Sequence, residues 1–322
     1  MVSTSDYKKS VEKSMVNCKE VNKYLFVRWN LDNLLSQMVK SEGYDYIAAY
    51  KGERCKLLSV VREMWFRAGF PFRSIWYNSK LKNYPYTIIV NDAMMTEDYL
   101  SWMKKNNPGA RLIFWYWNNV TNHVIAPAVV QNLGYELWSY SKKDCNKYGM
   151  KFNTQFYSEA FYKACSIKPD TEMKQDICFV GKDKGRMKQI YDLQQDLSVK
   201  IDAYFVADHF YEFYKNIKYH IKSLQYKEML QKYMESKAIL DIVTDVDGGI
   251  SLRILDGLYY KKKIITNCIA VKQYDFYHPD NIFVLGDRKK EEIPSFLTSA
   301  YHQIEDEIIS NYNFNEWLKR LE

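Results

Sequence analysis

The sequence predicts an α/β protein built of two halves, each with a mostly parallel sheet. Short apolar runs alternate with amphipathic stretches of helical spacing along nearly the whole chain, which is typical of strand–helix units. The alternation weakens between Ser158 and Gln175 and then starts again. We therefore expect two domains, 1–165 and 166–322, and the length of 322 residues fits two domains of average size.

In the first half, runs rich in β-branched and aromatic residues predict strands at Tyr24–Trp29, Tyr44–Tyr50, Tyr86–Val90, Arg111–Trp117 and Glu136–Tyr140. Helical spacing predicts the helices between them, at Leu34–Lys40, Lys56–Ala68 and Glu97–Lys105. Gly69 and Pro71 end the second of these helices, and Pro108 with Gly109 ends the third.

In the second half, the same signals predict strands at Asp176–Val180, Ile201–Val206, Ala238–Val243, Lys263–Thr266 and Asn281–Leu285. Helices are expected at Lys184–Leu197, Ser223–Met234, Ser251–Tyr260, Ser295–Ser310 and Phe314–Leu321. We expect that the last of these helices, Phe314–Leu321, can pack against the first domain. Ligands of such proteins bind in the cleft between the two halves.

Composition excludes several classes of protein. The formal net charge of +7 is too small for a nucleic-acid-binding arm, so no nucleic-acid partner is expected. Six scattered cysteines lack the spacing of zinc sites and disulfide frameworks, which favours reduced thiols in the cytoplasm. The first 20 residues do not resemble a signal peptide, and no apolar run approaches the length of a membrane span.

The most informative motif is a glycine-rich turn before a helix, Asp245-Val-Asp-Gly-Gly-Ile-Ser-Leu-Arg-Ile-Leu-Asp-Gly-Leu258. Gly248 and Gly249 permit tight backbone geometry, and Ser251 can cap a helix whose free N–H groups and dipole suit a phosphate. Helical spacing places Arg253 and Asp256 on the face of Gly249. Arg253 could bind a diphosphate and Asp256 the ribose hydroxyls. A plain turn with a solvated charged face explains the motif equally well.

A second motif, Asp176-Ile-Cys-Phe-Val-Gly-Lys-Asp-Lys-Gly-Arg186, joins the first strand of the second half to its helix. Gly181 is followed by the basic residues Lys182, Lys184 and Arg186, and nucleotide phosphates often approach such a turn. Taken alone, an exposed basic turn is the better explanation. The chain has neither G-x-G-x-x-G nor a P-loop, which counts against dinucleotide-binding enzymes and P-loop ATPases.

Together, the two motifs resemble those of bacterial glycosyltransferases with two Rossmann-like domains, the GT-B type. The runs Lys-Lys-Lys-Ile-Ile-Thr-Asn267 and Tyr274-Asp-Phe-Tyr-His-Pro-Asp-Asn-Ile282 strengthen this resemblance. Phe114-Trp-Tyr-Trp-Asn118 and Trp138-Ser-Tyr-Ser-Lys-Lys-Asp-Cys145 extend it into the first half. The chain beyond residue 85 is similar to lipopolysaccharide and capsule-biosynthesis transferases, some of them related to the spore-coat CgeB group.

The resemblance implies a GT-B-like fold with two domains facing a cleft, in which a sugar moves from a nucleotide-diphosphate donor, expected to be a UDP-sugar, to a glycan or lipid-linked glycan acceptor. The acceptor would lie mainly on 1–165 and the donor mainly on 166–322. The donor-binding residues expected from the motifs are Gly181, Lys182, Arg186, Gly248, Gly249, Ser251, Arg253, Asp256 and Asn267.

One position departs from the family pattern. Many retaining members carry two glutamates eight positions apart, where this chain has Gly248 and Asp256. The usual carboxylate partner of the donor sugar is therefore absent or replaced by Asp247, and retention or inversion stays open. Asp245 and Asp247 also form a D-x-D pattern, which holds a metal ion in another glycosyltransferase fold. Its late position disfavours that role, and no metal or other obligatory cofactor is expected.

An inverting transfer needs a base that deprotonates the acceptor hydroxyl. Asp92 is the candidate because it follows the carboxyl end of a strand, where cleft residues lie in α/β sheets. Asp32 and His123 are the alternatives. Asn118, at the end of the next strand, is expected to contact the acceptor.

Basic clusters at Lys104-Lys105, Lys142-Lys143, Lys261–Lys263 and Arg288–Lys290 are usually solvated faces. Our hypothesis is that they hold this cytoplasmic protein to anionic lipids at the inner face of the membrane. Two other functions stay open. One is another nucleotide-using α/β enzyme, such as an epimerase or methyltransferase. The other is a non-catalytic glycan- or nucleotide-binding protein of the same fold, which the departure at Gly248 keeps open.

Overall fold

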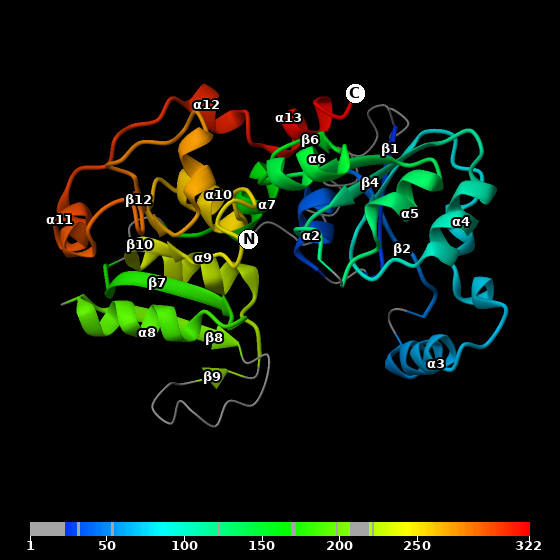
Figure 1. Ribbon diagram of the computed structural model, residues 1–322, viewed down its shortest axis with the longest axis horizontal. Helices are drawn as coiled ribbons and strands as arrows, with labels where there is room; N and C mark the ends of the chain where they lie inside the picture. The colour runs from blue at the N-terminus through cyan, green and yellow to red at the C-terminus, as the bar shows by residue number, and fades with distance from the viewer. Residues whose placement is uncertain are drawn as a thin grey trace, which may run out of the picture.

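The computed structural model describes residues 23–30, 33–52, 55–121, 123–168, 172–197, 199–206, 219–220 and 222–322. These residues form two parallel six-stranded sheets that lie side by side, each with helices packed on it (Figure 1). The protein is an α/β protein with two Rossmann-like domains, and this confirms the predicted fold class.

The first sheet has the strand order β2-β1-β3-β4-β5-β6, with every pair parallel. Its strands are β1 (Tyr24–Arg28), β2 (Asp45–Ala48), β3 (Thr87–Asn91), β4 (Arg111–Tyr116), β5 (Glu136–Ser139) and β6 (Lys151–Phe152). The helices of this half are α2 (Leu34–Ser41), α3 (Lys56–Arg67), α4 (Glu97–Asn106), α5 (Pro127–Asn132), α6 (Lys142–Tyr148) and α7 (Glu159–Cys165).

The second sheet has the order β12-β11-β10-β7-β8-β9, again with every pair parallel. Its strands are β7 (Gln175–Lys182), β8 (Ile201–Val206), β9 (Tyr219–His220), β10 (Ser236–Asp241), β11 (Lys263–Thr266) and β12 (Ile282–Val284). The order reverses between β7 and β10, as in doubly wound dinucleotide-binding folds. Ligands bind outside the carboxyl ends of the two strands at such a switch point.

The remaining helices are α8 (Met187–Asp196), α9 (Tyr226–Met234), α10 (Leu252–Tyr259), α11 (Ile293–Thr298), α12 (Asp306–Ser310) and α13 (Phe314–Lys319). The chain ends on the first domain, where α13 lies over the first sheet (Figure 1). The Trp317 ring lies 4.5 Å from that of Phe156 and 5.2 Å from that of Trp115, and the Asn153 amide donates to the Trp317 carbonyl.

Three predicted boundaries shift because a side chain bonds to the backbone. Asn267 Oδ1 accepts from the Val243 amide, so β10 ends at Asp241 instead of Val243. Asp183 Oδ1 accepts from the Met187 amide, and α8 begins three residues later than expected. Asn281 pairs with both backbone groups of His302, which keeps residues 299–305 out of the helix expected over Ser295–Ser310.

Candidate functional site

A pocket of about 430 Å³ lies between the two domains, a volume within the range that holds small-molecule ligands. Its walls come from segments that follow the carboxyl ends of β4 and β5 in the first sheet and of β7 and β10 in the second. The last two are the switch-point strands. The lining residues are Asn118, Asn119, Thr121, His123, Val124, Tyr140, Lys184, Arg186, Val243, Thr244, Asp245, Gly249 and Ser251.

The second-domain wall includes the amino end of α10. Ser251 is the N-cap of this helix, and its hydroxyl accepts from the Arg253 amide at 3.1 Å. The same hydroxyl donates to Asp241 Oδ1 at 2.7 Å. Because helix N-termini present N–H groups and a positive dipole end, this wall suits an anionic ligand.

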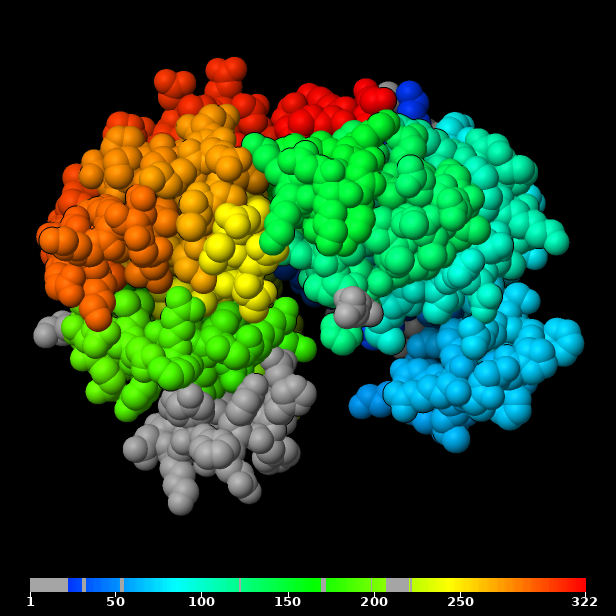
Figure 2. All heavy atoms as spheres, in the orientation of Figure 1, coloured from blue at the N-terminus to red at the C-terminus, as the bar shows by residue number. Residues whose placement is uncertain are grey.

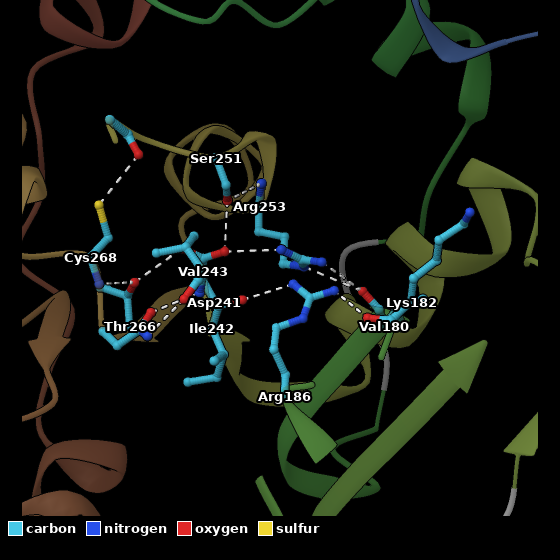
Figure 3. Close-up of polar contacts among 12 residues, drawn as sticks. Val180, Lys182, Arg186, Asp241, Ile242, Val243, Ser251, Arg253, Thr266 and Cys268 are labelled. Carbon is cyan, nitrogen blue, oxygen red and sulfur yellow. Dashed lines mark hydrogen bonds and ion pairs between the residues drawn. The ribbon is translucent and has the colours of Figure 1, made fainter. Parts of the chain in front are cut away.

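Asp241 is the centre of a buried polar network under this wall (Figure 3). Its carboxylate accepts from the Ser251 hydroxyl, from the Thr266 hydroxyl at 3.0 Å and from Arg253 Nη1 at 3.0 Å. The network thus joins β10, β11 and α10. It holds the amino end of α10 in place beside the pocket.

The two arginines expected to bind the donor are both largely buried. Arg253 donates to Asp241 and, through Nε and Nη2, to the Val180 carbonyl at 3.3 and 3.2 Å, and it does not line the pocket. Arg186 lines the pocket, but its guanidinium donates to the carbonyls of Asp183, Ile242 and Lys182. Both guanidinium groups lie over the Phe179 ring, at 5.1 and 5.2 Å from its centroid.

Gly181 leaves room for these guanidinium groups, because a Cβ there would lie 2.7 Å from Arg253 Nη2. Lys182, the next residue, is exposed, and its side chain points away from the network (Figure 3). Lys184 lines the pocket with a left-handed backbone, φ 47°. Asn267 lies behind the pocket, where its amide pairs with both backbone groups of Val243.

The glycine pair of the main motif lies directly against the first domain. A Cβ on Gly248 would lie 2.2 Å from Asn119 Nδ2, and one on Gly249 would lie 2.7 Å from the Tyr140 carbonyl oxygen. Gly249 also has φ +102°, a conformation that favours glycine. Next to this contact, Lys143 of α6 forms a 3.0 Å ion pair with Asp245. Figure 2 shows the two domains touching in this region, with a hollow below.

On the first-domain side, Asn118 and His123 both line the pocket. Asp92 lies beneath it and is fully buried. One carboxylate oxygen of Asp92 accepts from the backbone amide of Asn118 at 3.1 Å and from its side-chain amide at 3.4 Å. Burial raises the pKa of Asp92 to about 6, against the lowering effect of these bonds. Asp32, the other alternative, lies outside the described residues.

Asp256 is also fully buried, on the side of α10 away from the pocket lining. Its Oδ1 accepts from the hydroxyl of Tyr162 in α7 and from that of Tyr226 in α9 at 2.7 Å. Burial raises its pKa to about 7, although the two tyrosine hydroxyls and Arg253 act in the opposite direction.

The structure therefore brings Arg186, Gly249, Ser251 and Asn118 to one pocket, with Gly248 beside it. Gly181, Arg253, Asp256, Asn267 and Asp92 form or support the layer behind it. Sequence reasoning missed Asp241, Asn119 and Tyr140. The position of each relative to its strand could have pointed to it, since Asp241 ends β10, Tyr140 directly follows β5, and Asn119 follows β4 next to Asn118.

Among the described residues, no three His, Cys, Asp or Glu side chains are grouped so that they could hold a metal ion. No described helix is long and apolar enough to cross a membrane.

No protein-family model matches the sequence, and no curated protein matches it. Two solved structures are similar. One is a chain of the glycosylation associate protein (Gap123) complex from Streptococcus agalactiae, with 12% identity and a TM-score of 0.43. This match covers 81% of the present chain but only 57% of the other. The second is an α1,3-fucosyltransferase solved with GDP, with 11% identity and a TM-score of 0.49, covering 95% of this chain and 91% of that one. Both are likenesses of fold, at identities too low to carry over a substrate or a mechanism.

Proposed function

We propose that the protein is a glycosyltransferase that uses a nucleotide-diphosphate sugar as donor and that the interdomain pocket is its active site. The observation that carries the proposal is that the pocket opens at the switch point of the second sheet, beside the amino end of α10, and faces the strand ends of the first sheet. The sequence resemblance adds the reaction class. We further propose a UDP-sugar donor and a lipopolysaccharide or capsule glycan as acceptor, for a protein that acts in the cytoplasm.

The donor diphosphate would lie against the amino end of α10 and the side chain of Lys184, with the Gly249–Ser251 backbone close to it. Glycine at 249 allows this close approach, and the helix dipole together with the lysine charge stabilises the leaving diphosphate. Arg253 then acts through Asp241 as a positioning residue. That Asp256 binds the ribose hydroxyls stays a prediction. The hydroxyls of Tyr162 and Tyr226 already donate to its carboxylate and would compete with the ribose for it.

The acceptor would enter from the first domain, where Asn118 and His123 line the pocket. In the reaction, the acceptor oxygen forms a bond to the anomeric carbon of the sugar, the bond from that carbon to the β-phosphate oxygen breaks, and the nucleoside diphosphate leaves. We propose that His123 receives the proton of the acceptor hydroxyl, because it lines the first-domain side of the pocket. Asp92 would orient Asn118 through its two hydrogen bonds.

The first test is a thermal-shift screen with UDP, GDP, CDP, TDP, ADP and NAD, with and without Mn²⁺. A ligand that binds only the folded state raises the melting temperature. We expect a rise with one nucleoside diphosphate that is lost in Lys184→Ala and kept in Lys182→Ala, the matched control two positions away. No rise with any nucleoside diphosphate, or a rise with NAD alone, would overturn the proposal.

Binding is then separated from catalysis by following release of the nucleoside diphosphate from the donor sugar. Release that increases with a glycan acceptor supports transfer. A change of the sugar without release would identify an epimerase. Binding without any turnover across acceptors would identify the non-catalytic alternative.

A further inference from the structure

Exposed apolar side chains are concentrated on one segment of the first domain. Among the described residues, eight of the fourteen large apolar side chains that are exposed fall between residues 57 and 75. We call this set the α3 patch: Leu57, Leu58, Val60, Val61, Met64, Phe70, Phe72 and Ile75. Monomeric soluble proteins rarely expose so many neighbouring apolar groups, and such patches mark interaction sites.

The α3 helix has its apolar stripe turned outward. Leu57, Val61 and Met64 follow one helical face, and Leu57 and Met64 are 72% and 65% exposed. The buried residue of the helix is instead Arg62, 4% exposed, which lies over the Tyr50 ring at 5.0 Å. Figure 1 shows α3 at the margin of the first domain, away from the sheet, and Figure 2 shows the same residues as a separate light-blue lobe.

The turn after α3 extends the patch. The Trp65 ring lies 5.2 Å from that of Phe70, and its indole N–H donates to the Pro71 carbonyl at 2.9 Å. Phe72 follows in the left-handed region, φ 60°, and is 76% exposed. Because this conformation is unfavourable for a bulky residue, the turn holds Phe72 outward at some cost in stability.

The segment that carries the patch is rich in basic residues. From Cys55 to Lys82 the chain has six Lys or Arg residues, of which Arg62 is buried, and one acid, Glu63, a net charge of +5 against +7 for all 322 residues. Arg73 of this set is paired with Asp98. Apolar side chains flanked by Lys and Arg match the boundary between the headgroups and acyl chains of an anionic membrane. A second copy of the chain is disfavoured as the partner of this patch, because pairing two such patches would bring their positive charges together.

The basic clusters named from the sequence are less suited to this contact. Lys143 is paired with Asp245, and Lys290 with Asp196. Lys263 is buried and donates to the Ser299 hydroxyl. None of these clusters carries the group of exposed apolar side chains that the α3 segment has.

We propose that the α3 patch docks the protein on anionic lipid membranes. Leu57, Met64 and Phe72 enter the boundary between headgroups and acyl chains, while Lys56 and Arg67 contact the anionic headgroups. This docking does not depend on the proposed glycosyl transfer, since α3 contributes no residue to the interdomain pocket.

The test is flotation of the full chain with vesicles of phosphatidylcholine alone or with about 30% phosphatidylglycerol. We expect at least about tenfold more protein on the anionic vesicles, with the difference shrinking at high salt. Combining Leu57→Ser, Met64→Ser and Phe72→Ser should reduce binding about tenfold or more, because the apolar area available for insertion is lost. The matched control, Met173→Ser with Ile269→Ser, removes exposed apolar groups elsewhere and should bind as the wild type.

Charge variants test the contact of the basic residues with the anionic headgroups. Lys56→Glu with Arg67→Glu should lower binding to anionic vesicles, whereas Lys104→Glu with Lys105→Glu, the same charge change on α4, should lower it much less. Unfolding midpoints of all variants verify that they are folded. The proposal is overturned by equal binding to both vesicle types, by no binding, or by full binding of the patch variants. A concentration-dependent dimer that is lost in the apolar variant, without vesicle binding, would assign the patch to self-association instead.

Discussion

Replacing Arg253 by alanine separates a structural role of this arginine from a ligand-binding one. In the structure, Arg253 Nη1 forms a 3.0 Å ion pair with Asp241, and its Nε and Nη2 donate to the Val180 carbonyl. The Asp241 side chain is fully buried and that of Arg253 is 18% exposed. The substitution would leave the Asp241 carboxylate with two hydroxyl donors and no positive charge beside it.

Breaking a buried ion pair by removing one partner typically costs about 3–5 kcal/mol, because the remaining charge stays buried without compensation. We expect a loss of this size for Arg253→Ala in the second domain, with the apparent melting temperature lower by roughly 10 °C. A control is Lys163→Ala, which removes a cation from its exposed pair with Glu159 at 2.6 Å. Such exposed pairs contribute only about 0.2–1 kcal/mol.

Denaturant titration at low temperature gives the free energies of unfolding of Arg253→Ala and of the control variant. Calorimetry gives the nucleotide affinity of each folded protein. A structural Arg253 predicts a large loss of stability and an affinity within about threefold of the wild type. The opposite result, an unchanged unfolding free energy with an affinity lowered by tenfold or more, would refute this reasoning and assign Arg253 to the diphosphate.

Three further predictions concern the pocket and the layer behind it. Gly249→Ala places a Cβ 2.7 Å from a first-domain backbone oxygen and should lower nucleotide affinity, whereas Gly286→Ala, at a similar φ of +89° but in open space, should leave the affinity measured by calorimetry unchanged. Burial raises the pKa of Asp256 to about 7, so its stabilising effect is complete below about pH 4 and is lost as the pH rises through 7. Asp256→Asn should remove this decline, on the order of 4 kcal/mol, from the pH profile of unfolding. In a transfer assay, His123→Ala should lower kcat about 100-fold with donor binding retained, and a larger loss in Asp92→Asn than in His123→Ala would make Asp92 the base.

The alternation of strands and helices could be predicted because ten of the twelve strands in the described residues are short runs rich in apolar residues, whereas β6 and β9, of two residues each, went unpredicted. The strands at Ile201–Val206 and Lys263–Thr266 have the predicted bounds, and both are runs of this kind. The short helices α5, α6 and α7 went unpredicted, since six or seven residues give too few turns to establish a period. Boundaries such as the end of β10 failed because they depend on a side chain from a distant segment, Asn267.

The sequence predicted those pocket residues whose place in the fold follows from a local rule. Asn118, Ser251 and Arg186 follow the carboxyl ends of parallel strands, and topology alone brings such segments to one edge of a sheet. The helical spacing that placed Arg253 and Asp256 on the face of Gly249 fails for the glycine, because α10 begins at Leu252 and Gly249 precedes it with φ +102°. Spacing also does not say which way a helical face points. The partners that decide this, Asp241 for Arg253 and tyrosines of α7 and α9 for Asp256, are 12 to 94 residues away in the chain.

Asp241 shows how the layer behind a site can determine the chemistry in front of it. Asp241 has no exposure to water, and a buried carboxylate is costly unless charged or hydroxyl groups bond to it. Thr266 of β11 and Ser251 and Arg253 at the amino end of α10 supply them, so two elements beside the switch point converge on this carboxylate. Since the Arg253 charge is balanced by Asp241, attraction of a diphosphate would come mainly from the lining cations Lys184 and Arg186 and from the amino end of α10. Of these two cations Arg186 is buried and Lys184 is exposed, so Lys184→Ala is the change that should weaken donor binding without unfolding the domain.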